Sequence, residues 1–271
     1  MLPRSPRPFP QTSQPLLRSP LTLPFDRSIS AILLVDGPGP LPDILDQLAR
    51  LPLKEIIAVV EGEGSLALPQ LLEHPARPIP IHHPEPLGPG IGRSIAARAA
   101  QEDILLFVDS AVVIAAEELL PLLMQIGAGA DVALNNITPG LGNFADWEPA
   151  VNAQVCLNRL LGRGDLGANS LAALPHAMCR KVPETVGYSA LAVPPLAHAL
   201  ALAAGLAVCA PVSIGLPPGR PYLAGSGDAA ERQQLALGDH IEALQALMKR
   251  SGTRLGYPDR MRKRHIGEAV P

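Results

Sequence analysis

Three acidic side chains follow apolar stretches of this chain, and they are the residues best placed to bind a ligand. Asp36, Glu61 and Asp109 each come directly after a nearly uninterrupted apolar run. Such runs are typical of strands buried on both faces of a parallel sheet, and ligands bind outside the carboxyl ends of such strands. Turns also recruit single acids, so one alone indicates little. Three at one sheet edge favour a rim that faces a nucleotide.

The elements that must position these acids alternate between strand and helix patterns. The predicted strands are residues 30–35, 55–60, 79–83, 104–108, 131–134 and 207–212, with a strand and turn within 171–181. The predicted helices are residues 41–51, 66–73, 93–101, 117–126, 148–161, 194–205 and 228–250. This alternation predicts an α/β fold with a mostly parallel central sheet and helices on both faces. Right-handed crossovers would bring the three acids to one edge.

The last predicted helix is long and amphipathic. Leu235, Ile241, Leu244 and Leu247 are predicted to form its apolar side.

The composition excludes some classes of protein. A formal net charge of −3 over 271 residues argues against bulk binding of nucleic acid, and 3% aromatic residues predict an aliphatic core.

The cysteines, Cys156, Cys179 and Cys209, have no metal-binding spacing, so we expect reduced core thiols in a cytoplasmic protein. The apolar stretch 190–210 is interrupted by His198, and we expect a buried helix and strand there rather than a membrane span.

The two ends of the chain differ from the middle in composition. Residues 1–27 are rich in proline and arginine, which predicts a disordered arm, with a basic docking arm as the alternative. Residues 28–250 are expected to form the folded domain. Residues 251–271 form a basic tail, expected to be solvated or, alternatively, to make peripheral contact with a phosphate or an acidic lipid surface.

Four segments occur in an order that points to a family. They are EGEGS at 61–65, GRSIAAR at 92–98, ILLFVDSA at 104–111 and a later region at 180–208. Together these segments resemble family 2 glycosyltransferases, which have the GT-A fold, a Rossmann-like sheet. The resemblance covers roughly residues 29–215.

The resemblance implies transfer of a sugar from a nucleotide-sugar donor to an unknown acceptor, either a saccharide, a lipid or a small molecule. The base would lie near Asp36 and Glu61. Asp109 matches the first acid of the family's D-x-D motif, which holds Mn²⁺ or Mg²⁺ against the leaving diphosphate. Arg93, at a helix start in a glycine-rich setting, is expected to reach a phosphate.

The chain departs from the family pattern in two places. Ala111 replaces the second acid of D-x-D and has no side-chain atom that binds metal. Pro194 and Pro195 stand where the family has the acid pair that supplies a general base.

Other residues are candidates to replace the missing groups. His240 is a candidate metal ligand, with a solvated or capping histidine as the alternative, and Asp239 and His176 are candidate catalytic residues. His198 is expected to be a hydrogen-bonded core histidine. His82 and His83 end a strand, where they would form a turn or line the donor cleft.

Three other functions compete with sugar transfer. A catalytically inactive GT-A-like protein that binds a nucleotide or a partner would explain the two departures. A nucleotidyltransferase would need basic residues in the loop after the first strand, and residues 36–40 have none. A dehydrogenase would need a G-x-G-x-x-G motif after that strand, which is also missing.

Overall fold

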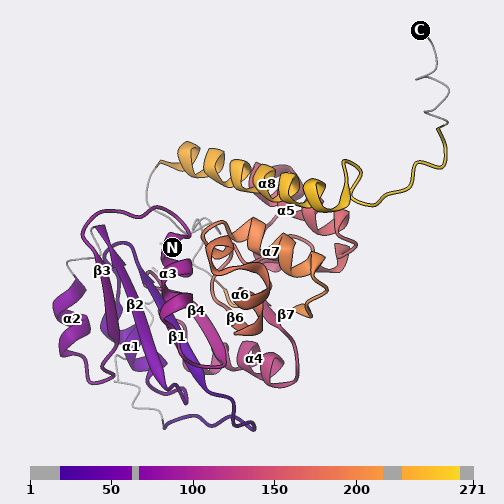
Figure 1. Ribbon diagram of the computed structural model, residues 1–271. Helices are drawn as coiled ribbons and strands as arrows, with labels where there is room; N and C mark the ends of the chain where they lie inside the picture. The colour runs from indigo at the N-terminus through magenta and orange to yellow at the C-terminus, as the bar shows by residue number, and fades with distance from the viewer. Residues whose placement is uncertain (1–18, 63–66, 216–227, 263–271) are drawn as a thin grey trace, which may run out of the picture.

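A single sheet organises the described part of the protein, which in this computed structural model comprises residues 19–62, 67–215 and 228–262. Within those residues the sheet has seven strands in the order β3-β2-β1-β4-β6-β5-β7 (Figure 1). The strands are β1 (Ile29–Val35), β2 (Glu55–Glu61), β3 (Ile79–His83), β4 (Ile104–Asp109), β5 (Val132–Asn135), β6 (His176–Cys179) and β7 (Val208–Val212).

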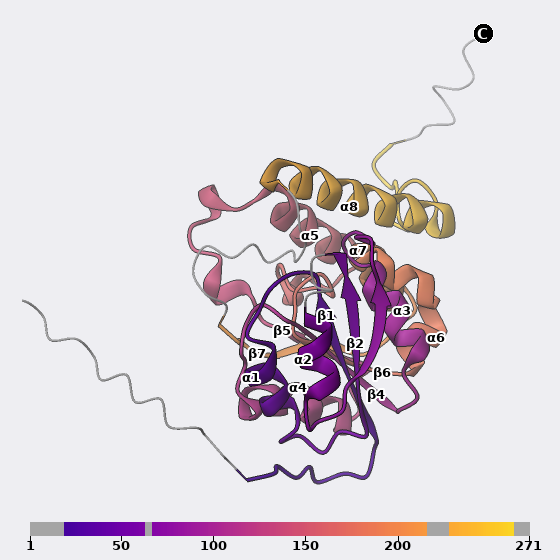
Figure 2. The same cartoon turned by 90° about the vertical axis from the view of Figure 1, so that its left-hand side faces the viewer.

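Helices cover both faces of this sheet. They are α1 (Leu41–Leu48), α2 (Leu68–Glu73), α3 (Ile91–Ala99), α4 (Ala116–Gly127), α5 (Pro149–Leu160), α6 (Lys181–Val186), α7 (Pro194–Ala203) and α8 (Ala229–Ser251). In Figure 2, α1 and α2 lie on one face, and α3 and α6 lie on the other. Arg50, just after α1, forms an ion pair with Glu117 of α4 at 2.5 Å, so α4 lies beside α1. The predicted α/β architecture is confirmed.

One strand breaks the parallel pattern. The pairs β1–β2, β1–β4 and β2–β3 are parallel, but β6 runs antiparallel to both β4 and β5. Because β6 is inverted, the loop that precedes it lies at the same edge as the carboxyl ends of β1, β2 and β4. The sheet is therefore mostly parallel, as predicted, and the inversion adds backbone groups to the edge where those carboxyl ends lie.

The core consists of aliphatic side chains from the strands and the facing helices. Every residue from Ile104 to Val108 is at most 3% exposed. Gly92, in the first turn of α3, has the side chains of Leu34 and Val59 3.3 Å from where a Cβ would stand. A side chain at this position would crowd both neighbours, so glycine lets α3 begin close to β1 and β2.

Helix α8 buries a different stripe from the one predicted. Its inward positions are Ala236, His240, Ala243 and Leu247, each at most 6% exposed, at spacings of four, three and four residues. Leu235 is 45% exposed and Ile241 is 57% exposed, so the predicted apolar side was wrong at these two positions. Small alanines at the contact let α8 approach α7 closely, which the larger leucines would prevent.

Other predictions about the chain have mixed outcomes. Helix α7, in the stretch 190–210, is largely buried, as expected. The expectation of a buried strand was wrong for most of β7, in which only Val208 is buried, because β7 is an edge strand of the sheet. Within the described residues, no helix is long and apolar enough to span a membrane. The three cysteines are unpaired, but Cys156 is exposed on α5 rather than in the core, because it lies on the outer side of that helix.

The terminal segments are only partly described. Residues 1–18 and 263–271 lie outside the described residues. Within the predicted arm, the backbone N–H of Leu21 donates to the carbonyl of Arg50 at 2.7 Å. The ring of Phe25 lies against Gly127, where a Cβ would come within 2.3 Å of it.

Candidate functional site

The three strand-end acids lie at one edge of the sheet. Asp36 follows β1, Glu61 ends β2 and Asp109 ends β4, and these strands are neighbours that run in the same direction. In the register, Val35 pairs with Val60, and Leu34 pairs with Asp109. The charge of Asp36 contributes to the raised pKa of Glu61, which places the two carboxylates near each other. The sequence prediction that these acids share an edge is confirmed.

The Glu61 carboxylate is held in a fixed orientation. Its Oε2 accepts hydrogen bonds from the backbone N–H groups of Leu87 at 2.5 Å and Gly88 at 3.2 Å. Partial burial raises the pKa of Glu61, these two amides oppose that effect, and Asp36 adds to it. The loop that supplies the amides leads from β3 to α3, so it couples Glu61 to the start of that helix. A carboxylate fixed in this way is a suitable acceptor for an N–H group of a ligand.

Asp109 begins a tight turn that contacts the loop after β1. Its Oδ1 accepts the backbone N–H of Ala111 at 2.9 Å. Across from it, a Cβ on Gly39 would lie only 2.0 Å from the carbonyl oxygen of Ser110. Only glycine permits this approach, which brings the loop that carries Asp36 against the turn that carries Asp109.

Arg93 is a buried cation in the first turn of α3. It is 6% exposed, and its guanidinium donates to the carbonyl oxygens of Leu171 and of Ala172, the latter at 3.0 Å. Its Nε is buried without a hydrogen-bond partner, and within the described residues no carboxylate forms an ion pair with it. Burial lowers the pKa of Arg93 to about 10, while the charge of Asp109 raises it. A buried cation of this kind favours binding of an anion.

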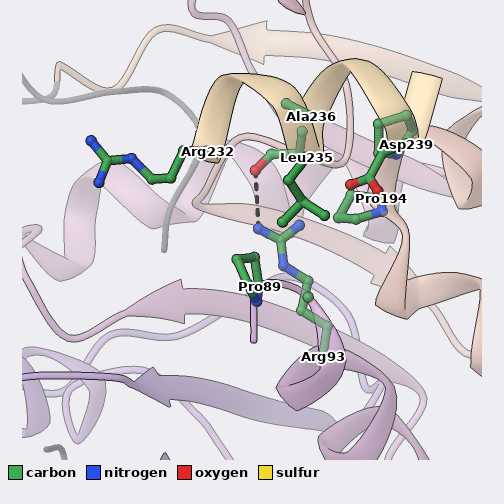
Figure 3. A pocket seen from close by; sticks show the side chains of 10 residues that line it. Pro89, Arg93, Pro194, Arg232, Leu235, Ala236 and Asp239 are labelled. Atoms are coloured by element: carbon green, nitrogen blue, oxygen red, sulfur yellow. Dashed lines mark hydrogen bonds between the residues drawn. The ribbon is translucent and has the colours of Figure 1, made fainter. Parts of the chain in front are cut away.

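A pocket opens beside Arg93, between the start of α3, the start of α7 and the amino-terminal half of α8. It is open to solvent, and its empty space, part of which is bulk solvent, amounts to about 470 Å³. Figure 3 shows the Arg93 guanidinium pointing toward α8 beneath Leu235, with Asp239 beside Pro194 and Arg232 extending away from the others. Its lining residues are Pro89, Gly90, Arg93, Ala172, Pro194, Pro195, Arg232, Leu235, Ala236 and Asp239.

Asp239 is the acid that lines this pocket. Burial raises the pKa of Asp239 to about 6, and the nearby charge of Glu242 adds to the effect. A carboxylate with a pKa close to the working pH is suited to accept a proton in a reaction. The structure therefore places this predicted catalytic candidate in the same pocket as Arg93.

The histidine candidates lie in less accessible positions. His240 is 3% exposed, and its ring nitrogens lie 2.6 Å from the Ala236 carbonyl oxygen and 3.2 Å from Gln154 Oε1. The structure does not bring it into a metal-binding group with Asp109, since within the described ranges no three His, Cys, Asp or Glu side chains converge. The reason is that α8 turns His240 toward α5.

His176 is enclosed by the sheet. It is 1% exposed, stacks on Phe107 with ring centroids 4.9 Å apart, and bonds through Nδ1 to the Ala173 carbonyl at 2.9 Å. Burial lowers the pKa of His176 to about 3, and the charge of Arg93 contributes. A neutral, enclosed ring is poorly placed to act on a bound acceptor, because β6 turns it into the core.

His198 and His83 have structural surroundings. His198 is fully buried and bonds through Nε2 to Asn158 Oδ1 at 2.8 Å, as expected of a core histidine, although its Nδ1 has no partner. His83 pairs in register with Glu61, at the edge that carries the three acids.

Sequence patterns alone did not identify several residues of this site. The Leu171 and Ala172 carbonyls carry no side-chain signal, since their position follows from the inversion of β6. Leu235 was assigned to the buried side of α8. The buried stripe runs back from Leu247 through two alanines and His240, and it leaves Leu235 at the pocket.

Comparison with known proteins now decides the family. The model of the family described as glycosyl transferase family 2 matches residues 38–182, more than half of the chain. The chain belongs to glycosyl transferase family 2. The match includes Glu61, Arg93 and Asp109, whereas Asp36 precedes it and Asp239 follows it. Membership favours sugar transfer from a nucleotide-sugar donor over the inactive alternative.

Solved structures share the fold of this family 2 protein at low sequence identity. Glucosyl-3-phosphoglycerate synthase from Mycobacterium tuberculosis, in complex with Mn²⁺, UDP and glucosyl-3-phosphoglycerate, has a TM-score of 0.52 and 17% identity, covering 86% of this chain and 82% of that one. Mannosyl-3-phosphoglycerate synthase from Rubrobacter xylanophilus has a TM-score of 0.53 and 14% identity, covering 90% and 79%. No curated protein sequence matches the chain.

Proposed function

We propose that this protein transfers a sugar from a nucleoside-diphosphate sugar to an acceptor bound in the pocket beneath α8. The observation that carries the proposal is the juxtaposition of the carboxylate edge with a buried cation: Asp109 is close enough to Arg93 to influence its pKa. The donor needs both groups, since its base carries N–H donors and its diphosphate is anionic.

The donor occupies the edge formed by β1, β2 and β4. Glu61 accepts a hydrogen bond from the base, because the Leu87 and Gly88 amides fix its carboxylate there. Asp36 lies on the adjacent strand end and completes the base site. Arg93 stabilises the diphosphate, for which its buried charge has no competing ion pair within the described residues.

Asp109 is proposed to hold a divalent cation. One carboxylate fits this role, because Mg²⁺ commonly binds one or two protein carboxylates and takes its other ligands from phosphate and water. Ala111 supplies no side-chain ligand, and His240 faces α5. When bound, the cation neutralises charge on the leaving diphosphate. The solved complex of the glucosyl-3-phosphoglycerate synthase contains Mn²⁺ and UDP, which supports this assignment.

Asp239 is proposed as the proton acceptor. The acceptor hydroxyl attacks the anomeric carbon while the bond from that carbon to the diphosphate breaks, and the hydroxyl proton passes to the Asp239 carboxylate. With a pKa of about 6, Asp239 is mostly ionised at pH 7 and ready to take this proton.

Calorimetry and product analysis test the proposal. UDP and GDP, and then their hexose conjugates, are titrated with Mn²⁺ or Mg²⁺. Release of the free nucleoside diphosphate is then followed with a panel of acceptors. The panel includes 3-phosphoglycerate, because the names of both similar synthases contain it. We expect metal-dependent heat with one nucleotide and product with one acceptor. An absence of both heat and donor cleavage across the panel would overturn the proposal.

A further inference from the structure

A chain of buried polar side chains connects α8 to α5 and α7 directly behind the pocket. His240 of α8 is 3% exposed, Gln154 and Asn158 of α5 are 4% and 0% exposed, and His198 of α7 is 0% exposed. The contacts are His240 Nε2 to Gln154 Oε1 at 3.2 Å, Gln154 Nε2 to Asn158 Oδ1 at 3.1 Å, and His198 Nε2 to Asn158 Oδ1 at 2.8 Å. Polar groups this deeply buried need partners, so each link matters.

Backbone carbonyls fix the direction of this chain. Asn158 Nδ2 faces the carbonyl oxygens of Gly167 at 2.9 Å and Asn169 at 3.1 Å, which only accept hydrogen bonds. Asn158 must therefore present its amide nitrogen to them and its Oδ1 to Gln154. It follows that Gln154 donates to Asn158 and turns its own Oε1 toward His240. The ring of His240 is thus the required donor across the gap between α8 and α5.

The same ring also faces its own helix. Nδ1 lies 2.6 Å from the Ala236 carbonyl, so both ring nitrogens face oxygen acceptors. The ring donates to both only when it carries two protons, which burial opposes by lowering the pKa of His240. The Nε2 contact is the one that ties the helices together, and within the described residues the other inward positions of α8 are Ala236, Ala243 and Leu247, which offer no side-chain hydrogen bond.

We infer that His240 is a positioning residue, which anchors α8 to α5 through Gln154 and thereby holds Asp239 and Leu235 over the pocket. Asp239 is its immediate neighbour, and Ala236, whose carbonyl the ring contacts, also lines the pocket. This inference rests on the proposed function, because the proposed function gives Asp239 a bound acceptor to act on. It assigns His240 a role through hydrogen bonding between helices and not through metal.

Four variants test the anchor. His240→Leu removes both ring contacts, whereas His240→Gln retains an N–H donor that reaches toward Gln154. Gln154→Met removes the partner from α5 and leaves α8 unchanged, so it serves even if His240→Leu fails to fold. Ile241→Gln is the matched control, because Ile241 is the next residue of α8 and is 57% exposed.

Steady-state kinetics and hydrogen exchange are measured on all four full-length variants. We expect His240→Leu and Gln154→Met to lower kcat about tenfold with the donor KM within about twofold, since acceptor-side geometry changes and the donor edge does not. Amides 235–239 should exchange about tenfold faster, and those of β1 and β4 at unchanged rates. His240→Gln and Ile241→Gln should remain near the natural protein. Natural kcat and exchange in His240→Leu and Gln154→Met, or His240→Gln as impaired as His240→Leu, would overturn the inference.

Failure of the proposed function gives a different result. The natural protein would then transfer no sugar, and amide exchange alone would judge the anchor. Faster exchange at 235–239 in His240→Leu and Gln154→Met, but not in His240→Gln, would support it, and equal exchange in all variants would overturn it.

Discussion

The two halves of the sheet place their polar side chains differently. In the half formed by β1 to β4, Asp36, Glu61 and Asp109 stand at strand ends, partly exposed, at one edge. In the part of the chain from β5 to α8, one set of polar side chains is buried and bonded together, namely the chain from His240 to Asn158. We propose that the first half presents charge to a ligand and that the second uses polar groups to hold helices together.

This difference shows that residue type alone does not identify a functional group. The acids of the first half are ordinary in type, but parallel strands bring them together. The histidines of the second half are more suggestive in type, yet His176 and His198 are enclosed, and burial lowers the pKa of each to about 3. Asp239 is the exception in the second half, because α8 carries it back to the pocket beside Arg93.

The largest effect is expected at Asp109. Replacing it with alanine should lower the rate of donor cleavage about 10³-fold, because charge stabilisation by a bound cation contributes several kcal/mol. Initial rates at saturating Mn²⁺ measure this. Asp146→Ala, at an exposed position outside the site, is the control and should keep the natural rate. Equal rates for Asp109→Ala and Asp146→Ala would contradict the claim that the strand-end acids of the first half act on a ligand.

A somewhat smaller effect is expected at Asp239. Asp239→Asn should lower kcat/KM about 10²-fold, within the range for loss of a general base. In the natural protein kcat/KM should fall as the pH drops below about 6, since a carboxyl with its pKa there becomes protonated and no longer accepts a proton. The pH profile of kcat/KM checks this. A profile that is flat from pH 5 to 8 in the natural protein would exclude Asp239 as the base.

Replacing Arg93 should have an effect of intermediate size on both ligand affinity and stability. Arg93 connects the two halves, because it lies in α3 and donates to the carbonyls before β6. Arg93→Lys keeps the charge but cannot bond the Leu171 and Ala172 carbonyls as a planar fork does. We expect UDP affinity to fall about tenfold and unfolding free energy to fall by about 1–3 kcal/mol. Calorimetry and denaturant unfolding measure the two quantities. Natural values of both would contradict the role assigned to this buried cation.

The smallest effect is expected on the outer side of α8. Ile241→Gln should change the free energy of unfolding by no more than about 0.5 kcal/mol, because Ile241 is 57% exposed. Leu247→Ala, four residues beyond Ala243 on the buried stripe, should cost about 2–4 kcal/mol. Equal costs in denaturant unfolding would show that the stripe has been assigned to the wrong side of the helix.

The sequence was most informative where local pattern and topology agree. Continuous apolar runs that end in acids predicted β1, β2 and β4 and the edge they share, because crossover handedness leaves few alternatives. A strand was predicted within 171–181, where β6 lies, but its antiparallel direction was not, since a four-residue strand carries no signal for direction. The inward side of α8 was also missed, because close helix packing favours alanine over leucine at the contact. His240 was a candidate metal ligand because of the family resemblance, with a solvated or capping histidine as the alternative. Its actual bonding depends on an amide side chain of α5 that is distant in the sequence.

The most direct test of the account is a crystal structure of the protein with UDP and Mn²⁺. We predict that the uracil lies between Asp36 and Glu61, that Mn²⁺ binds Asp109 and the diphosphate, and that the diphosphate faces Arg93. A structure in which UDP binds away from the ends of β1, β2 and β4, or with Mn²⁺ not in contact with Asp109, would contradict it.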